Sequence, residues 1–487
     1  MNFNSAAFLI FLPIAVGVHW LLPHRLRIYW LLAASWFFYM YWNPLLLLLL
    51  LASTAVDYFC GLGMEHFRAR PGLRKALLLC SICVNLGLLF FFKYWDFFGG
   101  IANAALARLS LPDRVPTLNL LLPVGISFYT FQTMSYSIDV YRGDAPAERS
   151  FPVFALYVSF FPQLVAGPIE SPAHLLPQLK AVRSFHWEDF SAGARLLMCG
   201  FFRKCVVADY CGIYVNAVFE HPEQANAPAI LGACALFCIQ MYCDFAGYSE
   251  IASGSARLMG VRLIRNFDRP YLAQSYGEFF RRWHISLNRW FTNYVYIPLG
   301  GSRRGPARKL LNTLIVFALC GLWHGARWTY ILWGLYAAFW VCLESLIKKP
   351  ARRAAKRLSV NLAGPAVILG RRCLMFLIYL PAALLFRSVS VAQTGLLLQR
   401  LFSTGFSLNE TLSILQLNGF GILQLALVLT AMTRLHVWGA EDLPSAPDGT
   451  GNMRRIVSAA YFVLIILLSS FALLAAQETT GFAYFQF

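Results

Sequence analysis

Long apolar runs alternate with short polar and basic segments along the whole chain. A helix needs about 20 apolar residues to cross the hydrocarbon core of a bilayer, and shorter runs can enter it part-way. We expect such segments near residues 6–22, 28–43, 44–64, 75–95, 118–136, 151–167, 191–213, 228–248, 310–345, 371–387, 411–432 and 455–476. Because backbone polar groups need partners in lipid, each run predicts a helix. The pattern therefore predicts an all-α, polytopic membrane protein.

Three stretches interrupt the apolar runs with proline, glycine or many polar side chains: Leu118–Gly143, Phe161–Ser171 and Asn266–Gly301. They predict broken or re-entrant helix, which is tolerated at membrane depth only where protein covers it or it lines a cavity. A cavity inside the bundle is therefore expected. The sequence has no internal repeat and no long polar linker, so we predict a single integral-membrane domain over residues 1–487.

Composition supports a membrane protein and argues against nucleic-acid binding. Hydrophobic residues make up 58% of the chain and charged residues 13%, with a formal net charge of +18. The basic residues gather in loops, chiefly Arg257–Lys309 and Lys348–Arg372, as the positive-inside rule predicts for cytoplasmic loops. The 12 cysteines lie mostly within apolar runs, so we expect neither a disulfide framework nor a metal site.

The run at 310–345 has basic clusters on both sides, which requires an even number of crossings if both clusters face the cytoplasm. It is too short for two full spans. We therefore predict a hairpin that enters the membrane, turns near Gly321–Gly325 and leaves again. A single long tilted helix is the alternative, and either arrangement buries His324.

His324 is the strongest candidate for chemistry, because an ionisable side chain within an apolar run is costly to keep there. The alternative is a structural histidine bonded to a backbone carbonyl. Gly321 and Gly325 favour a functional role, since they leave room for another backbone or a substrate beside the imidazole. The neighbouring Trp323 is a candidate for substrate contact.

Residues 276–296 fit one amphipathic helix lying in the cytoplasmic interface. Its polar side carries Arg281, Arg282, His284 and Asn288, which are candidates for contact with head groups or an anionic substrate. A helix that only anchors the protein to the membrane surface is the alternative. On periodicity alone, His284 is most simply a solvated surface residue.

Asp244 is a carboxylate at the end of an apolar run and needs a partner. We expect an ion pair with one of the arginines of residues 257–269. A proton relay or a contact with substrate is the alternative.

The sequence lacks a hydrolase elbow, a phosphate-binding loop, paired glycosidase carboxylates and a dinucleotide fingerprint. The buried, neutral imidazole of His324 is therefore the remaining candidate for a catalytic group. Such a group can take a proton from a hydroxyl that attacks an activated carbonyl and pass it to the leaving group. A thioester donor would react in this way without an acyl-enzyme intermediate.

Five segments together resemble the membrane-bound O-acyltransferase family, and within it the bacterial alginate O-acetyltransferase type. They are LPVGISFYTFQTMSYSIDVYRG (122–143), FFPQLVAGPIE (160–170), YCDFAGYSE (242–250), NFDRPYLAQSYGEFFRRWHISLNRWFTNYVYIPLGG (266–301) and CGLWHGARW (320–328). The resemblance covers essentially the whole chain in order, with its core motifs in 118–345.

The resemblance implies a bundle of about 11–13 transmembrane and re-entrant helices around a central funnel. It places the family's catalytic histidine on His324 and a second conserved histidine on His284. It also implies a cytoplasmic acyl thioester donor, acetyl-CoA or an acyl-carrier protein, with no bound cofactor. The expected setting is the cytoplasmic membrane of a bacterium, with a cell-surface polysaccharide as acceptor and an extracytoplasmic acetyltransferase as partner.

The sequence does not identify the polymer that accepts the acyl group. Ala246 and Glu250 stand where the alginate branch has serine and aspartate, and such differences do not identify a polymer. Alginate-type exopolysaccharide is the first hypothesis, and D-alanyl, cellulose or peptidoglycan acyl transfer is the second. A proton-coupled transporter or export subunit is a different class of alternative, although transporters are often built from repeats that this chain lacks. A scaffold subunit, which would tolerate loss of His324, is another.

Overall fold

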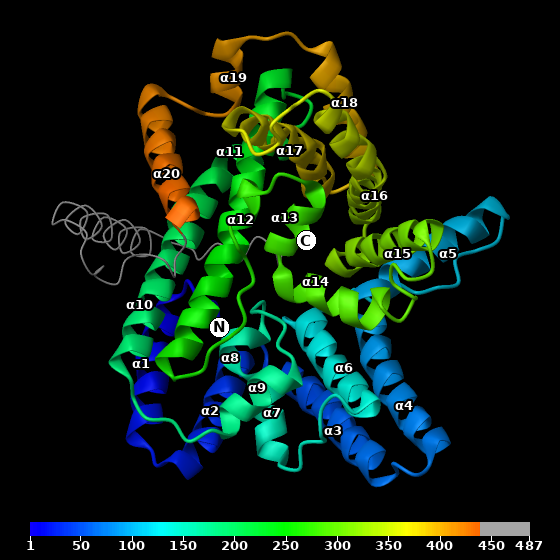
Figure 1. Cartoon of the computed structure of the whole chain (residues 1–487), viewed down its shortest axis with the longest axis vertical. Coiled ribbons are helices and arrows are strands. Elements are labelled where there is room, and N and C mark those ends of the chain that lie inside the picture. The colour runs from blue at the N-terminus through cyan, green and yellow to red at the C-terminus, as the bar shows by residue number, and fades with distance from the viewer. Residues whose placement is uncertain (439–487) are drawn as a thin grey trace. The chain divides into compact units, whose positions relative to one another are not determined.

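The computed structural model describes residues 1–438, and within that range the chain forms helices and no strand (Figure 1). The all-α prediction is thereby confirmed. The apolar run predicted at 455–476 lies outside the described residues.

The chain's internal contacts divide it into two compact units, and the division falls within two helices, α10 (Trp187–Phe201) and α12 (Ala227–Leu258). The first unit comprises Met1–Leu197 and Ser249–Ile264. Its other helices are α1 (Ala6–Leu21), α2 (His24–Met40), α3 (Pro44–His66), α4 (Pro71–Leu89), the π-helical η1 (Phe90–Tyr94), α5 (Trp95–Arg108), α6 (Ile126–Arg142), α7 (Phe151–Ser159), α8 (Phe161–Leu164) and α9 (Pro172–Lys180).

The second unit comprises Met198–Tyr248 and the chain from Arg265 onward. Its other elements are the π-helical η2 (Phe202–Ala208), α11 (Asp209–Phe219), the 3-10 turn η3 (Pro270–Leu272), α13 (Tyr276–Arg282), α14 (Ile285–Phe291), the π-helical η4 (Thr292–Tyr296), α15 (Pro306–His324), α16 (Trp328–Arg357), α17 (Pro365–Arg387), α18 (Val391–Ser403), α19 (Leu408–Ile414) and α20 (Gly419–Trp438). The predicted single domain over 1–487 stays a prediction.

Within residues 1–438, five helices are long and apolar enough to cross a membrane. They are Pro44–His66, Pro71–Arg108, Ala227–Leu258, Trp328–Arg357 and Pro365–Arg387. The pair Leu408–Ile414 and Gly419–Thr433, bent by 76°, would make a sixth span. The predicted runs at 44–64, 75–95, 228–248 and 371–387 are therefore confirmed as span-length helices, whereas the run at 411–432 is bent.

The first two stretches predicted to be broken helix are interrupted. Residues 111–123 are not helical, so the run predicted at 118–136 becomes a helix only at Ile126. Gly125, with φ of 78°, permits this entry, because a Cβ there would lie 2.5 Å from the carbonyl oxygen of Leu164. In the second stretch, Phe161–Ser171, the short helix α8 ends at Leu164, and the chain is not helical again until Pro172.

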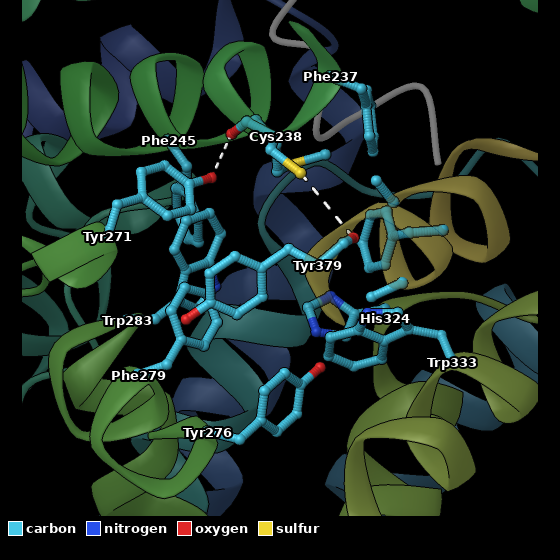
Figure 2. Close-up of a pocket in the computed structure, with 14 residues that line it drawn as sticks. Phe237, Cys238, Phe245, Tyr271, Tyr276, Phe279, Trp283, His324, Trp333 and Tyr379 are labelled. Atoms are coloured by element: carbon cyan, nitrogen blue, oxygen red, sulfur yellow. Dashed lines mark hydrogen bonds between the residues drawn. The ribbon is translucent and has the colours of Figure 1, made fainter. Parts of the chain in front are cut away.

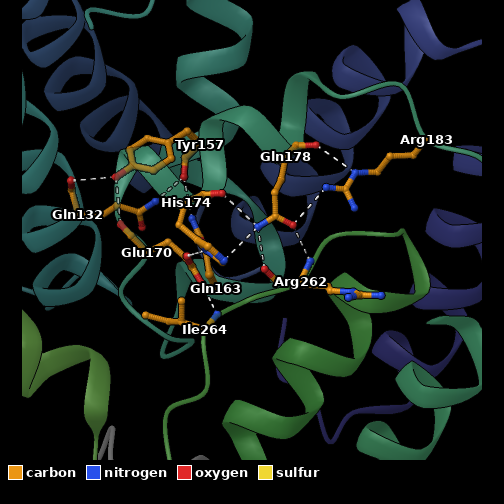
Figure 3. A network of polar contacts seen from close by, with 9 residues as sticks. All are labelled: Gln132, Tyr157, Gln163, Glu170, His174, Gln178, Arg183, Arg262 and Ile264. Carbon is orange, nitrogen blue, oxygen red and sulfur yellow. Dashed lines mark hydrogen bonds and ion pairs between the residues drawn. The ribbon is translucent and has the colours of Figure 1, made fainter. Parts of the chain in front are cut away.

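Beyond α8, a polar network holds the segment after α12 to α9 in the first unit (Figure 3). The Glu170 carboxylate, which is fully buried, accepts a hydrogen bond from the Ile264 amide at 2.6 Å and lies 2.6 Å from Nδ1 of His174. The Gln178 side chain accepts from the amide of Arg262 and donates to its carbonyl, at 3.0 and 2.9 Å. A buried carboxylate needs such donors, so the network fixes where the chain leaves α12.

Candidate active site

Helices α15 and α16 form the predicted hairpin, joined by a short turn at residues 325–327. The two helices approach closely because each has a glycine at the contact, where the backbone of the other helix occupies the space of a side chain. A Cβ at Gly321 would lie 2.2 Å from the carbonyl oxygen of Tyr330, and one at Gly334 would lie 2.2 Å from that of Phe317. The predicted hairpin is therefore confirmed as two packed helices joined by a turn, and the single tilted helix is wrong, whereas entry of the hairpin into the membrane stays a prediction.

His324 is the last residue of α15 and lines a pocket with an empty volume of about 640 Å³ (Figure 2). Its imidazole packs edge-on against Trp333 of α16 and Phe386 of α17, with ring centroids 5.1 and 5.2 Å away. A cavity was predicted inside the bundle, and the structure has one beside His324 within the second unit. Its walls are mostly aromatic and aliphatic, and its lining is completed by Phe237, Cys238, Met241, Phe245, Tyr271, Tyr276, Phe279, Trp283, Tyr379, Ala382 and Ala383.

Three tyrosines supply polar atoms to this wall. The hydroxyl of Tyr271 donates to the carbonyl of Cys238 and is therefore engaged. The hydroxyl of Tyr276 is turned towards His324 and Trp333 in Figure 2. The buried hydroxyl of Tyr379 has no hydrogen-bond partner among the described residues. The pocket therefore offers a few oriented polar groups on an apolar surface, as small-molecule sites commonly do.

The prediction of one continuous amphipathic helix over residues 276–296 is wrong. The segment is divided into α13, α14 and η4, with the break at Trp283–His284, where His284 adopts φ of 44°. The Asn288 side chain stabilises the break by donating to the carbonyls of Phe280 and Trp283 at 2.7 and 2.6 Å. Asn288 therefore holds the backbone here, and its predicted contact with substrate stays a prediction.

The break turns His284 inward, so its predicted position on the polar surface is also wrong. The residue is 1% exposed, and its Nδ1 lies 3.1 Å from Oδ1 of Asn266. Because that oxygen can only accept, Nδ1 carries the proton of a neutral ring. Burial, and secondly the charge of nearby His324, lower the pKa of His284 well below its ordinary value of 6.5.

The two histidines do not share the pocket wall. His324 lines it, whereas His284 lies behind Phe245, with ring centroids 4.6 Å apart. Trp323 contacts both imidazoles, 5.1 Å from that of His324 and 6.0 Å from that of His284. Trp323 is buried and is not part of the lining. Trp323 therefore lies between the two imidazoles, and the predicted catalytic role of His284 and substrate contact of Trp323 stay predictions.

The two candidate arginines lie away from the pocket. Arg282 pairs with Glu278 one turn earlier, with Nη2 and Oε1 2.8 Å apart, and Arg281 is exposed. Neither lines the cavity beside His324. Their predicted contact with an anionic group stays a prediction.

Asp244 is fully buried and forms an ion pair, whose partner in the structure is a lysine, whereas the arginine partner predicted for it stays a prediction. Its Oδ1 lies 2.9 Å from Nζ of Lys204, a buried lysine in η2 that also contacts Asp209 at 2.7 Å. The reason is close packing of η2 on α12 at Gly247, where a Cβ would lie 3.0 Å from the Lys204 amide nitrogen. The lysine thereby reaches the carboxylate directly.

Most pocket residues were not singled out from the sequence. Tyr271, Tyr276 and Phe279 fall inside the motif at 266–301, so the motif was the available signal. Tyr379 and Phe386 lie in an ordinary apolar run on α17, where no pattern distinguishes a pocket wall from a lipid-facing or core residue.

Fold and site together define a multi-pass helical membrane protein with one imidazole in an aromatic pocket. The sequence profile of the membrane-bound O-acyltransferase family matches residues 145–380. The chain is 35% identical over 508 residues to the probable alginate O-acetylase AlgI of Pseudomonas putida, covering 100% of both chains. It is 38% identical over 445 residues to that of Pseudomonas syringae pv. tomato, covering 91% of this chain and 82% of the relative.

A peptidoglycan O-acetyltransferase of Helicobacter pylori is 35% identical over 333 residues, covering 63% of this chain and 62% of the relative. The chain belongs to the membrane-bound O-acyltransferase family. It is therefore a multi-pass O-acyltransferase of the bacterial cell membrane.

Proposed function

We propose that the protein moves an acetyl group from a cytoplasmic thioester toward a hydroxyl of a cell-surface polysaccharide, with His324 as the general base. The observation that carries this proposal is the place of His324 in the 640 Å³ pocket. Among the residues that line it, His324 alone has a side chain whose ordinary pKa is near neutral pH.

In the proposed reaction, the acceptor hydroxyl loses its proton to the neutral imidazole of His324 as its oxygen attacks the thioester carbonyl. The carbon–sulfur bond then breaks, and the imidazolium returns the proton to the departing thiolate. The base is regenerated in each cycle, and no covalent bond to the protein forms. The products are an ester of the acceptor and a free thiol.

The aromatic wall supports this chemistry in two ways. It offers apolar surface for an acyl thioester, and it excludes water that would compete as acceptor. His284, neutral because of its lowered pKa, supports the pocket from behind. We assign it a positioning role, exerted on His324 through Trp323.

We propose alginate-type exopolysaccharide as the acceptor, because full-length relatives carry the name alginate O-acetylase. The peptidoglycan relative supports a second candidate acceptor. D-alanyl or cellulose acyl transfer would use the same histidine. The donor, acetyl-CoA or an acyl-carrier protein, and an extracytoplasmic acetyltransferase that completes transfer, are proposed from the family resemblance. Family membership favours these enzymatic roles over a transporter or a scaffold.

The test is to express the gene in a bacterium that lacks its own copy and to measure ester-linked acetate on each surface polymer. We expect acetate on exopolysaccharide with the unaltered chain and with His221→Ala, an exposed histidine. His324→Ala should abolish it while the protein stays inserted. Undiminished acetylation with inserted His324→Ala would contradict the proposal, and acetate on peptidoglycan alone would change the acceptor.

A further inference from the structure

A second pocket, whose empty volume of about 330 Å³ includes the solvent at its mouth, lies within the first unit and shares no lining residue with the pocket of His324. The corner between α1 and α2, the end of α9 and the segment after α12 surround it. Its polar lining consists of His19, His24, Arg27, Gln178 and Arg183. The acyl-transfer chemistry proposed above uses none of these residues.

Two half-buried arginines face this pocket, and the groups that accept their hydrogen bonds are neutral. Arg27 donates to the carbonyls of Leu22 and Arg183 at 3.0 and 2.7 Å, and its guanidinium stacks on Trp20 with the ring centroid 4.9 Å away. Arg183 donates to the carbonyl and the side-chain oxygen of Gln178, both at 3.2 Å (Figure 3). These contacts fix both guanidinium groups without neutralising their charge.

No carboxylate lines the pocket. The acidic side chain on the neighbouring α10, Asp189, pairs with two other arginines and also attracts Arg183 electrostatically. It accepts from Arg257 at 3.2 Å and from Arg262 at 2.8 Å. The electrostatic potential of the pocket is therefore positive, and an anion would be attracted to it.

His19 adds a second observation. It is 5% exposed and lines the pocket, and its contact with the backbone of Met259 leaves at least one ring nitrogen without a hydrogen-bond partner among the described residues. A buried polar side chain without such a partner commonly marks a place for a ligand or water. A phosphate oxygen would be a suitable acceptor for its N–H.

The surface around the pocket suits a lipid-water interface. Large apolar side chains are exposed beside it, including Leu21 at 86%, Tyr29 at 58% and Trp187 at 69%. Ile28, Leu31, Leu179 and Val261 give the pocket itself apolar walls. Aromatic and apolar side chains next to arginines are typical of the level of phospholipid head groups. The segment after α12 also begins the basic cluster expected to face the cytoplasm.

We propose that this pocket binds a phosphate group, and that its source is the head group of an anionic phospholipid in the cytoplasmic leaflet. Arg27 and Arg183 would hold the phosphate oxygens, His19 would donate from the pocket's interior, and the acyl chains would follow the exposed apolar surface. The site would anchor the α1–α2 corner at a defined depth. It is separate from the proposed acceptor and donor sites.

The test uses the full-length protein purified in detergent and stripped of lipid. Phosphatidylglycerol is added back, and the retained lipid is counted by native mass spectrometry, with the shift in melting temperature measured in parallel. We expect retention by the unaltered chain and at least about a tenfold loss of affinity in Arg27→Gln/Arg183→Gln, because two charge-assisted contacts are removed. Arg25→Gln, an exposed neighbour with the same change of charge, should retain the lipid.

The single variants Arg27→Gln and Arg183→Gln keep the test decisive if the double variant does not fold, since each should lose part of the affinity. Titration with coenzyme A and with inorganic phosphate distinguishes the sources. If these soluble phosphates bind, if the arginine variants lose that binding and if no lipid is retained, the phosphate site is supported. The proposal that a phospholipid supplies the phosphate is then wrong. Equal retention of phosphatidylglycerol by the double variant and Arg25→Gln would overturn the proposal.

Discussion

The backbone of Gly321 in α15 packs directly on the carbonyl oxygen of Tyr330 in α16, so that an added Cβ would lie 2.2 Å from that oxygen. Gly334 makes the reciprocal approach to Phe317. The hairpin therefore has no room for a side chain at either position. Since His324 follows Gly321 by one turn, this contact sets the position of the imidazole.

Gly321→Ala should separate the two helices and move His324. Overpacking of this kind costs about 1–3 kcal/mol of stability, and a shift of about 1 Å in a reacting group can reduce the rate about 100-fold. We expect a lower melting temperature in detergent and a large loss of acyl transfer. Gly370→Ala on α17, where no atom lies within 4 Å of the added Cβ, is the matched control and should lower neither the melting temperature nor the rate.

His284 should make the protein sensitive to acid. Its pKa in the folded state lies below 6.5 because of burial, whereas the unfolded chain binds the proton near 6.5. The unfolded state therefore takes up more protons as the pH falls below 6.5, and stability decreases by up to about 1.4 kcal/mol per pH unit. Above that pH, both states are neutral and the contribution is absent.

The measurement compares melting temperatures at pH 7.5 and 5.5 for the unaltered chain and His284→Asn. Asparagine tolerates the positive φ of 44°, and its amide can donate to Asn266. We expect a smaller acid-induced decrease in the variant, whereas the exposed control His221→Asn should behave like the unaltered chain. An identical decrease in all three proteins would show that His284 titrates normally.

Lys204 and Asp244 form a buried pair whose members depend on each other. Lys204→Met leaves the Asp244 carboxylate without its ammonium partner, and breaking such a pair costs about 3–5 kcal/mol. The double variant Lys204→Met/Asp244→Leu removes both charges and should recover much of that loss. Thermal unfolding in detergent measures both, and a double variant less stable than the single one would point to a role beyond the ion pair.

The sequence predicted the span-length helices and the hairpin because the length of an apolar run and the basic residues that flank it are local signals. The break at His284 was not predictable from periodicity, because it depends on Asn266, 18 residues earlier in the chain. The residues that form the pocket wall could not be predicted from the sequence either. Phe386 and Trp333 face His324 from separate helices, and only their packing together distinguishes them from other apolar residues.

Ala383 on α17 offers a test of whether the pocket holds the acyl donor. Ala383→Leu should fill part of the cavity and raise KM for the thioester several-fold, with little change in melting temperature, because the new methyl groups enter empty space. Ala366→Leu, at an exposed position of the same helix, is the control and should leave KM unchanged. An unchanged KM in Ala383→Leu would place the donor elsewhere.

The role of His324 is tested most directly by the transfer of labelled acetyl from a thioester to a polysaccharide acceptor, with the purified protein and any required partner. Removal of a general base typically costs 100- to 10,000-fold in rate, so His324→Gln should lose about that much. His221→Gln should retain full activity. A folded His324→Gln protein that transfers acetyl at the unaltered rate would contradict the account.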